Sequence, residues 1–277
     1  MSYKNVLTIQ DISCVGQCSL TVALPIISAC GMETCILPSA ILSTHTAGFS
    51  GYTVHDLTDD IPEIQAHWVK ENIKFDAIYT GYLGSTKQID YVKNIMASLG
   101  KENLIKIVDP AMADNGKLYP AFDRNYVEAM KTLCFDADII IPNITEACFL
   151  TDIEYKENFD EEYIENLLSK LEEFGAKTIV LTGVGYTEGK TGVAVRENGR
   201  TAIFEHEKIA KGSHGTGDVY ASAFVGALLN DKSVFDSAKI AAEYTVECIL
   251  KTQGDPDHWY GVKFETALPK LINLLNN

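Results

Sequence analysis

Basic residues are scarce in this sequence of 277 residues. Lys and Arg total 23 against 38 Asp and Glu, so the formal net charge is −15. This charge repels a nucleic-acid backbone and an anionic membrane over most of the protein surface. We therefore expect no nucleic-acid partner and no membrane partner, and any anionic ligand must be held by local structure.

Long apolar runs and paired cysteines are also missing. No run approaches the roughly 18 apolar residues that span a bilayer, and the N-terminal MSYKNVLTIQ lacks the basic-then-apolar layout of a signal peptide. The seven cysteines are odd in number and scattered through mostly apolar stretches, which favours reduced, buried thiols. The sequence therefore predicts a cytoplasmic protein.

Linkers, repeats and hydrolase motifs are absent as well. No Pro/Ser-rich or charged block divides the chain, so we expect a single domain over residues 1–277. The six histidines show no HExxH spacing, and no GxSxG motif occurs. The stretch TGVGYTEGKT (182–191) has neither P-loop nor dinucleotide-binding spacing, so it predicts a surface turn followed by an edge strand.

Short β-branched runs alternate with longer segments of helical period, which predicts an α/β fold with a mostly parallel sheet and helices on both faces. Asn198-Gly199 lies between two further strand-like runs and predicts an antiparallel edge hairpin. The predicted strands are 5–10, 33–37, 76–80, 104–109, 138–142 and 178–182. The predicted helices are 19–30, 60–71, 86–99, 124–134, 145–151, 160–174, 217–229, 234–252 and 264–275.

The stretch KGSHGTGD (211–218) opens one of these helices. A helix N-terminus carries unpaired N–H groups and partial positive charge, so it attracts anions. Glycines at 215 and 217 let a ligand approach the backbone, and Thr216 adds a hydroxyl group. Asp218 has two interpretations that the residues alone leave open: it caps the helix, or it accepts a proton from a hydroxyl group that attacks a bound phosphate.

Several stretches together resemble a known family. GTGDVYASAF (215–224) resembles the signature of the ribokinase-like superfamily of small-molecule kinases. STHTAGF (43–49), TGYLGS (80–85), VDPAMADNGKLY (108–119) and IPNITEA (141–147) resemble its vitamin B6 branch, the pyridoxal/pyridoxamine kinases. The matching segments follow the order of the family and extend from about residue 5 to 230.

The resemblance implies transfer of the ATP γ-phosphoryl group to the hydroxymethyl group of a substituted pyridine, in vitamin B6 salvage. Asp218 matches the general base, and the backbone amides of Gly215, Thr216 and Gly217 match the anion hole. Phosphoryl transfer depends mainly on alignment and on neutralisation of negative charge, which agrees with such a site.

The resemblance also implies Mg²⁺, a hard cation that binds few carboxylates and keeps several waters. Asp109 and Glu146 match the metal positions, although the residues alone allow an ordinary cap or turn role for each. On the nucleotide side, Asn143, Thr182, Asp114 and Tyr119 match ATP-binding positions. The alternative for Tyr119 is a packed loop aromatic. A monovalent cation near the anion site stays an open alternative that no residue here decides.

On the vitamin side, Thr46 and Tyr82 match positions near the pyridine ring, and His45 is either a ligand or a hydrogen-bonded core histidine. The family has a Ser-His pair after its first strand, where this chain has Asp11-Ile12-Ser13. Either Asp11 or Ser13 takes the place of the ring-binding serine. A carboxylate there favours an amine or a protonated ring nitrogen, which suggests pyridoxamine over pyridoxal.

Other departures leave alternatives open. His214 directly before the glycines and Gly183 after Thr182 affect substrate choice rather than reaction type. The nearest competing function is a hydroxymethylpyrimidine (phosphate) kinase of thiamine synthesis, and the competing class is a non-catalytic B6-binding protein. By analogy with B6 kinases we expect a homodimer.

Overall fold

The structure is a computed structural model that describes residues 3–209 and 214–277. Its strands are β1 (Asn5–Ser13), β2 (Glu33–Leu42), β3 (Val54–Asp56), β4 (Phe75–Thr80), β5 (Gly100–Val108), β6 (Ala113–Asp114), β7 (Lys117–Leu118), β8 (Ile139–Ile140), β9 (Thr178–Thr182), β10 (Lys190–Glu197) and β11 (Arg200–Glu207). Its helices are α1 (Leu20–Ala29), α2 (Ile61–Lys70), α3 (Thr86–Leu99), α4 (Arg124–Cys134), α5 (Ile144–Thr151), α6 (Glu161–Glu173), α7 (Thr216–Leu229), α8 (Val234–Thr252) and α9 (Phe264–Asn276).

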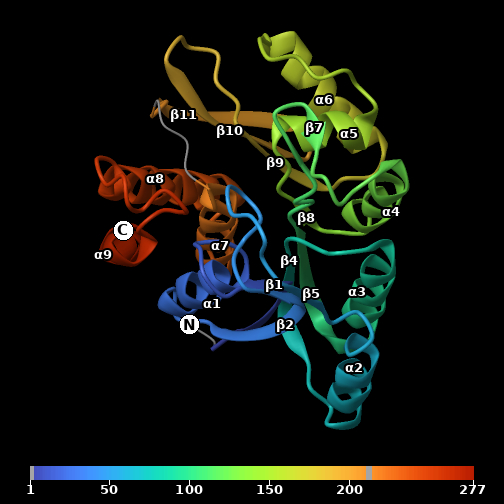
Figure 1. The fold of residues 1–277 in the computed structure, drawn as a ribbon. Coiled ribbons are helices and arrows are strands. Elements are labelled where there is room, and N and C mark those ends of the chain that lie inside the picture. Colours follow the sequence, from blue (N-terminus) through green and yellow to red (C-terminus); the bar gives the residue numbers. More distant parts are fainter. Residues whose placement is uncertain (1–2, 210–213) are drawn as a thin grey trace.

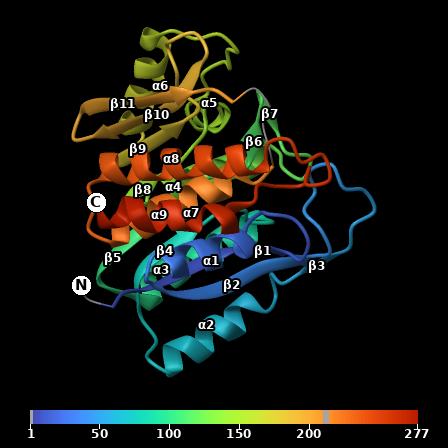
Figure 2. The ribbon, with the colours of Figure 1, turned by 90° about the vertical axis from the view of Figure 1, so that its left-hand side faces the viewer.

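A mixed sheet runs through the molecule in the order β11-β10-β9-β8-β5-β4-β1-β2-β3. The strands from β9 to β2 pair in parallel, whereas β10, β11 and β3 are antiparallel additions at the two edges. Helices α1, α7, α8 and α9 cover one face, and α2 to α6 cover the other (Figures 1 and 2). The mostly parallel sheet, the helices on both faces and the edge hairpin are thus confirmed.

The parallel strands are buried on both faces because helices cover both, and their sequences accordingly show little alternation. In β4, for example, Ala77, Ile78 and Tyr79 are all inaccessible to solvent. Two hydrophobic cores result, one on each side of the sheet. This covered sheet is the rigid support for the loops that follow its strands.

The carboxyl ends of the parallel strands lie along one edge, where ligands of such sheets bind. β1 extends three residues beyond the predicted strand, through a register shift between Gln10 and Ile12, and so carries Asp11 and Ser13 to that edge. β3 and the small hairpin β6–β7 are additions that the sequence patterns did not predict. The stretch 182–191 is the expected turn, since β10 and not a helix follows it.

Candidate active site

The N-terminus of α7 is built on close backbone packing. Gly215 is its N-cap residue and has φ 76°, a left-handed conformation that favours glycine. A Cβ atom at Gly215 would lie 1.7 Å from the carbonyl oxygen of Gln17, so only glycine fits there. The helix begins at Thr216 and places Asp218 in its first turn. Lys211, Gly212 and Ser213, which open the sequence motif, lie outside the described residues.

The Asp218 carboxyl group is held in a desolvated and negatively charged environment. Burial raises its pKa to about 7, and the charges of Asp109 and Asp11 act in the same direction. The backbone N–H of Ser19 opposes this rise. Asp218 is still partly exposed, so a ligand can reach a carboxylate whose pKa suits proton transfer near neutral pH.

A second acid, Asp11, lies on the same side of the site. Asp11 is only 5% exposed, and burial raises its pKa, whereas the hydroxyl groups of Ser19 and Ser13 lower it. The Ser13 hydroxyl donates to Asp11 Oδ2 over 2.9 Å. The two residues that the sequence offered as alternatives near the ring are therefore joined, and Asp11 is the one that lies within electrostatic reach of Asp218.

Asp109, directly after β5, and Glu146, on α5, form a pair of interacting carboxylates, of which Glu146 is buried and Asp109 is partly exposed. Burial raises the pKa of Asp109, and burial together with the Asp109 charge raises that of Glu146. Both oxygens of Glu146 already accept backbone hydrogen bonds, from Met112 at 3.0 Å and from Asn143 at 2.8 Å. Glu146 thus closes a capping box on α5 and ties that helix to the loop after Asp109.

These carboxylates fit a cation. Among the described residues, the strongest influences on their pKa values are burial, the Asp109 charge acting on Glu146, and backbone amides, and no basic side chain is among them. Within residues 3–209 and 214–277, no group of three His, Cys, Asp or Glu side chains forms a closed metal site. An ion that keeps several waters, as Mg²⁺ does, matches this open arrangement better than one that needs a full protein cage.

The nucleotide-side residues cluster around β6–β7. The Asn143 side chain caps α5 through Glu146 N–H and donates to the Ala113 carbonyl at 2.8 Å, so it anchors the hairpin. Asp114 accepts both the backbone and side-chain N–H groups of Asn115 at the hairpin turn. Tyr119, 37% exposed, closes the hairpin by donating its amide to the Met112 carbonyl over 2.9 Å.

Tyr119 and Thr182 bring this hairpin and the end of β9 to the same edge. Burial raises the pKa of Tyr119, as do the charges of Glu146 and Asp109. Thr182 ends β9 and donates its amide to the Pro142 carbonyl at 2.9 Å. Thr182 also forms a β-bridge with Asn143, which caps the helix that carries Glu146.

His45 is held by backbone contacts. Its Nδ1 accepts the Ala47 amide at 3.2 Å, and its Nε2 lies 2.7 Å from the Tyr260 carbonyl, so the neutral imidazole carries its proton on Nε2. Both ring nitrogens are engaged, and the ring is only 4% exposed. This geometry favours the core-histidine alternative.

The neighbouring candidates Thr46 and Tyr82 differ in exposure. Thr46 is exposed and free to meet a ligand at the mouth of the site. Tyr82 is partly buried, and burial raises its pKa to about 12, followed by the charge of Asp11. Its ring lies 5.3 Å from that of Phe122. Tyr82 follows β4 and Asp11 lies near the end of β1, the strand that pairs with β4.

Aromatic side chains from a distant part of the chain pack against the loop that follows β2. Trp259, in the segment between α8 and α9, has its ring 4.7 Å from that of Phe49, which in turn lies 4.9 Å from His45. His45 also lies 5.6 Å from His214. The segment 258–261 therefore covers the loop that follows β2.

Sequence reasoning missed Trp259, because no local pattern places it near residue 49. Its position becomes visible only when the chain is folded.

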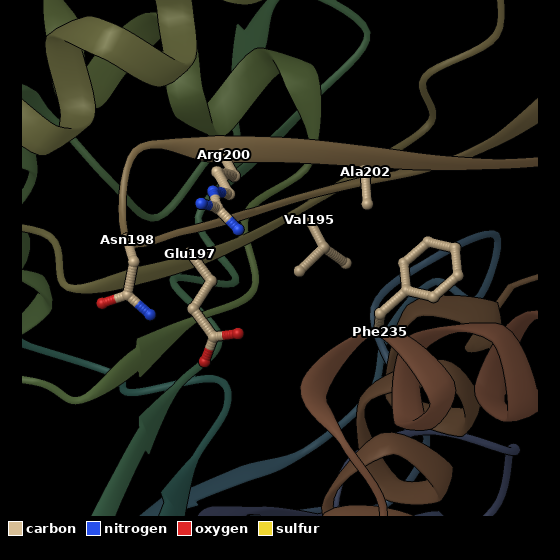
Figure 3. Close-up of a pocket in the computed structure, with 6 residues that line it drawn as sticks. All are labelled: Val195, Glu197, Asn198, Arg200, Ala202 and Phe235. Carbon is tan, nitrogen blue, oxygen red and sulfur yellow. The ribbon is translucent and has the colours of Figure 1, made fainter.

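A cavity lies away from these candidate site residues. It has a volume of about 320 Å³ and opens between the β10–β11 hairpin and the first turn of α8 (Figure 3); its lining consists of Val195, Glu197, Asn198, Arg200, Ala202 and Phe235. Glu197 pairs with Thr178, at the start of β9, whereas the candidate site lies beyond Thr182 at its end. The cavity is therefore separate from the strand-end site.

The mixed sheet, the glycine-opened helix with its acid, and the carboxylate pair define an ATP-dependent small-molecule kinase. The sequence model of the phosphomethylpyrimidine kinase family matches residues 23–261, and the chain belongs to this family. In the described part of the chain, no helix is long and apolar enough to span a membrane.

The similar proteins include pyridoxal kinases as well as kinases of hydroxymethylpyrimidine and phosphomethylpyrimidine. A Bacteroides thetaiotaomicron protein assigned as a phosphomethylpyrimidine kinase is 34% identical, with a TM-score of 0.92 over 98% of this chain and 96% of that chain. The pyridoxal kinase of Lactobacillus plantarum is 31% identical, with a TM-score of 0.91 over 99% and 98%. The hydroxymethylpyrimidine/phosphomethylpyrimidine kinase of Bacillus subtilis is 26% identical over 78% of each chain. The chain is thus a kinase of the pyridoxal/hydroxymethylpyrimidine kinase family.

Proposed function

We propose that this kinase phosphorylates the 5′-hydroxymethyl group of a vitamin B6 vitamer at the expense of ATP, with Asp218 as the general base. The observation that carries this proposal is the position of Asp218 in the first turn of α7, with a pKa raised to about 7. A carboxylate at an anion-binding helix end competes with phosphate unless it serves an attacking hydroxyl group. In the proposed reaction, Asp218 serves the attacking hydroxyl group of the vitamer.

In this mechanism the chain aligns the reactants and balances charge. The amides of Gly215, Thr216 and Gly217 hold the transferring phosphoryl group, while Asp218 accepts the hydroxyl proton. Asp109 and Glu146 would hold Mg²⁺, and the bound ion would supply positive charge to offset that of the phosphates. Base catalysis of this kind contributes on the order of 10²- to 10⁴-fold.

The nucleotide lies between the β6–β7 hairpin and the end of β9 in this proposal. Asp114 and Tyr119 cover ATP from one side, Thr182 contacts it from the other, and Asn143 fixes the hairpin. Tyr119 would exclude water from the phosphates, which limits hydrolysis. A monovalent cation beside the anion hole stays an open part of this proposal, and adding K⁺ or Na⁺ to the assay decides it.

The vitamin ring is placed among Asp11, Ser13, Thr46 and Tyr82, with His45 supporting the loop behind it. Tyr82 offers a stacking face and a hydroxyl group. The structure of the Bacteroides thetaiotaomicron protein contains pyridoxal, which supports a B6 vitamer here. Asp11 favours the vitamer with an amine, so we propose that pyridoxamine is used with the highest kcat/KM.

A hydroxymethylpyrimidine (phosphate) kinase is the second candidate, favoured by the matching family model and by the Bacillus subtilis relative. The deciding experiment is a coupled ADP assay with Mg-ATP against pyridoxamine, pyridoxal, pyridoxine and hydroxymethylpyrimidine. We expect pyridoxamine to give at least a tenfold higher kcat/KM than the pyrimidine. The reverse order would replace the B6 assignment, and equal kcat/KM for pyridoxamine and pyridoxal would remove the role of Asp11.

We also propose a homodimer, on the strength of the family resemblance. Ile41, Tyr52 and Val54 are 39%, 38% and 57% exposed at the β2–β3 edge, an apolar surface that a second copy would cover. Light scattering should give twice the 30.5 kDa of one chain. A mass of 30.5 kDa at micromolar concentration would contradict this proposal.

A further inference from the structure

The loop that follows β4 carries Tyr82 and is held by its backbone. The Ser39 hydroxyl, on β2, donates to the Tyr82 carbonyl at 3.3 Å. The Tyr126 hydroxyl, on α4, donates to the next carbonyl, that of Leu83, at 2.7 Å. Ser39 is inaccessible to solvent and Tyr126 is only 3% exposed. Two buried side chains from different elements thus hold two consecutive carbonyl groups of a loop at the strand-end site.

Gln88, on α3, holds the third consecutive residue of this loop. Its Oε1 accepts the Gly84 amide at 2.7 Å, and its Nε2 donates to the Ser39 carbonyl at 3.0 Å and to the Thr58 hydroxyl at 2.8 Å. The Gln88 side chain is inaccessible to solvent, and both of its amide hydrogens are used. A buried amide is costly unless its polar atoms are paired. When they are paired, such a network favours one conformation of the backbone that it binds.

The Tyr82 ring is supported from the same part of the fold. Its centroid lies 5.3 Å from that of Phe122, and Phe122 stacks on Tyr126 with centroids 3.8 Å apart and an angle of 12° between the ring planes. Helices α3 and α4, which carry Gln88 and Tyr126, lie side by side (Figure 1). Tyr126 therefore acts on Tyr82 in two ways, through the carbonyl of the following residue and through the ring of Phe122.

We propose that Ser39, Tyr126 and Gln88 are positioning residues that set the place of the Tyr82 ring and thereby the fit of the substrate ring. This inference rests on the proposed function, in which Tyr82 offers a stacking face to the vitamer. Stacked rings interact only within a narrow range of offsets and angles, so a displaced Tyr82 weakens vitamer binding. ATP, placed at the end of β9 in that proposal, keeps its contacts, because β5 and β8 separate β9 from β4.

The test uses Tyr126→Phe and Ser39→Ala in the full chain, each of which removes one hydroxyl group. Phenylalanine keeps the stack on Phe122, so only the hydrogen bond to Leu83 is lost. We expect the KM for pyridoxamine to rise about fivefold in each variant, the order expected for one lost hydrogen bond. The KM for ATP should stay within about twofold of the wild type. Gln88→Met keeps the length of the side chain and loses all three bonds, so it should give the largest rise; if it fails to fold, the two hydroxyl variants decide.

Tyr163→Phe is the matched control. The Tyr163 hydroxyl, on α6, also donates to a backbone carbonyl at 2.7 Å, that of Glu154, and α6 packs on β9 rather than on β4. A merely structural role would lower the Tm of Tyr126→Phe and Tyr163→Phe alike and leave the KM for pyridoxamine unchanged in both. An unchanged KM in Tyr126→Phe and Ser39→Ala would overturn the inference, and so would an equal rise in Tyr163→Phe.

Failure of the proposed function gives a different result. The wild type is assayed in parallel with the B6 vitamers and with hydroxymethylpyrimidine. If it phosphorylates only the pyrimidine, the B6 assignment fails and the same KM comparison is made with the pyrimidine. If it phosphorylates none of them, the proposed function fails, and hydrogen exchange of the Gly84 amide tests the positioning. Exchange should be faster in both hydroxyl variants than in the wild type, and equal exchange would overturn the inference.

Discussion

Gly215 lies so close to the carbonyl oxygen of Gln17 that a methyl group at residue 215 would be 1.7 Å from it. The loop after β1 and the loop before α7 are therefore packed backbone against backbone. This contact joins the acid at the end of β1 to the acid in the first turn of α7. The resemblance to ribokinase-like enzymes implied Gly215 as an anion-binding amide, and the fold gives it this second reason to be glycine.

Gly215→Ala should reduce kcat/KM at least a hundredfold. The added methyl group must displace Gln17, and the positive φ of residue 215 adds about 1 kcal/mol of strain. Gly31→Ala is the control, because Gly31 has φ 88° but nothing within 4 Å of an added Cβ. Activity and Tm measured side by side should show a kinetic loss only at residue 215. Equal activity in the two variants would contradict the contact.

Asp109→Asn should raise the Mg²⁺ concentration needed for half-maximal activity by at least tenfold. The charge of Asp109 acts on the buried Glu146, and a cation would offset this repulsion. The measurement is a Mg²⁺ titration of ADP production at saturating ATP. The exposed Asp90, on α3, supplies the control variant Asp90→Asn. An unchanged Mg²⁺ curve for Asp109→Asn would remove this residue from the metal site.

The pH dependence of stability should reveal the raised pKa of Asp218. Its folded-state pKa of about 7 lies above its ordinary value of 3.8, so the protonated form is favoured by folding. This stabilisation is present in full below about pH 4 and is lost as the pH rises through 7. The Tm of the ligand-free wild type should therefore fall more between pH 5 and 8 than that of Asp218→Asn. Parallel Tm curves for the two proteins would contradict the raised pKa.

Trp259 should report vitamer binding. Its side chain is 44% exposed and packs on Phe49, beside the loop that carries Thr46. A B6 vitamer bound there should quench its fluorescence, because pyridine rings of this kind absorb in the range of tryptophan emission. Trp68 lies on α2 against Phe75, so Trp68→Phe should keep the quenching and Trp259→Phe should lose it. Quenching that survives in Trp259→Phe would place the vitamer elsewhere.

Much of the fold follows from periodicity. Helices 86–99, 124–134 and 234–252 begin and end where their patterns predict, because caps such as Ser85 and Asp123 stand directly before apolar stripes. The strand β3 was missed, since Val54–Asp56 is three exposed residues that pair only because β2 extends to Leu42. The β6–β7 hairpin was also missed. Its strands have two residues each, too few for a periodic signal.

Some residues of the candidate site could likewise be predicted from the sequence, and others could not. Asp218 and Asp109 could be named because each stands beside a recognisable strand end or helix start. Trp259 could not, because its contact with Phe49 joins two segments that lie far apart in the sequence. For His45 the sequence left two roles open, a ligand or a hydrogen-bonded core histidine. Its backbone partners favour the core role.

Asp218→Asn tests the central claim most directly. The amide keeps the shape of the side chain but accepts no proton at neutral pH, so pyridoxamine and ATP should still bind, with dissociation constants within threefold of the wild type. Vitamer-dependent ADP production should fall at least a hundredfold. Turnover within tenfold of the wild type would show that the acid at the start of α7 is not the base.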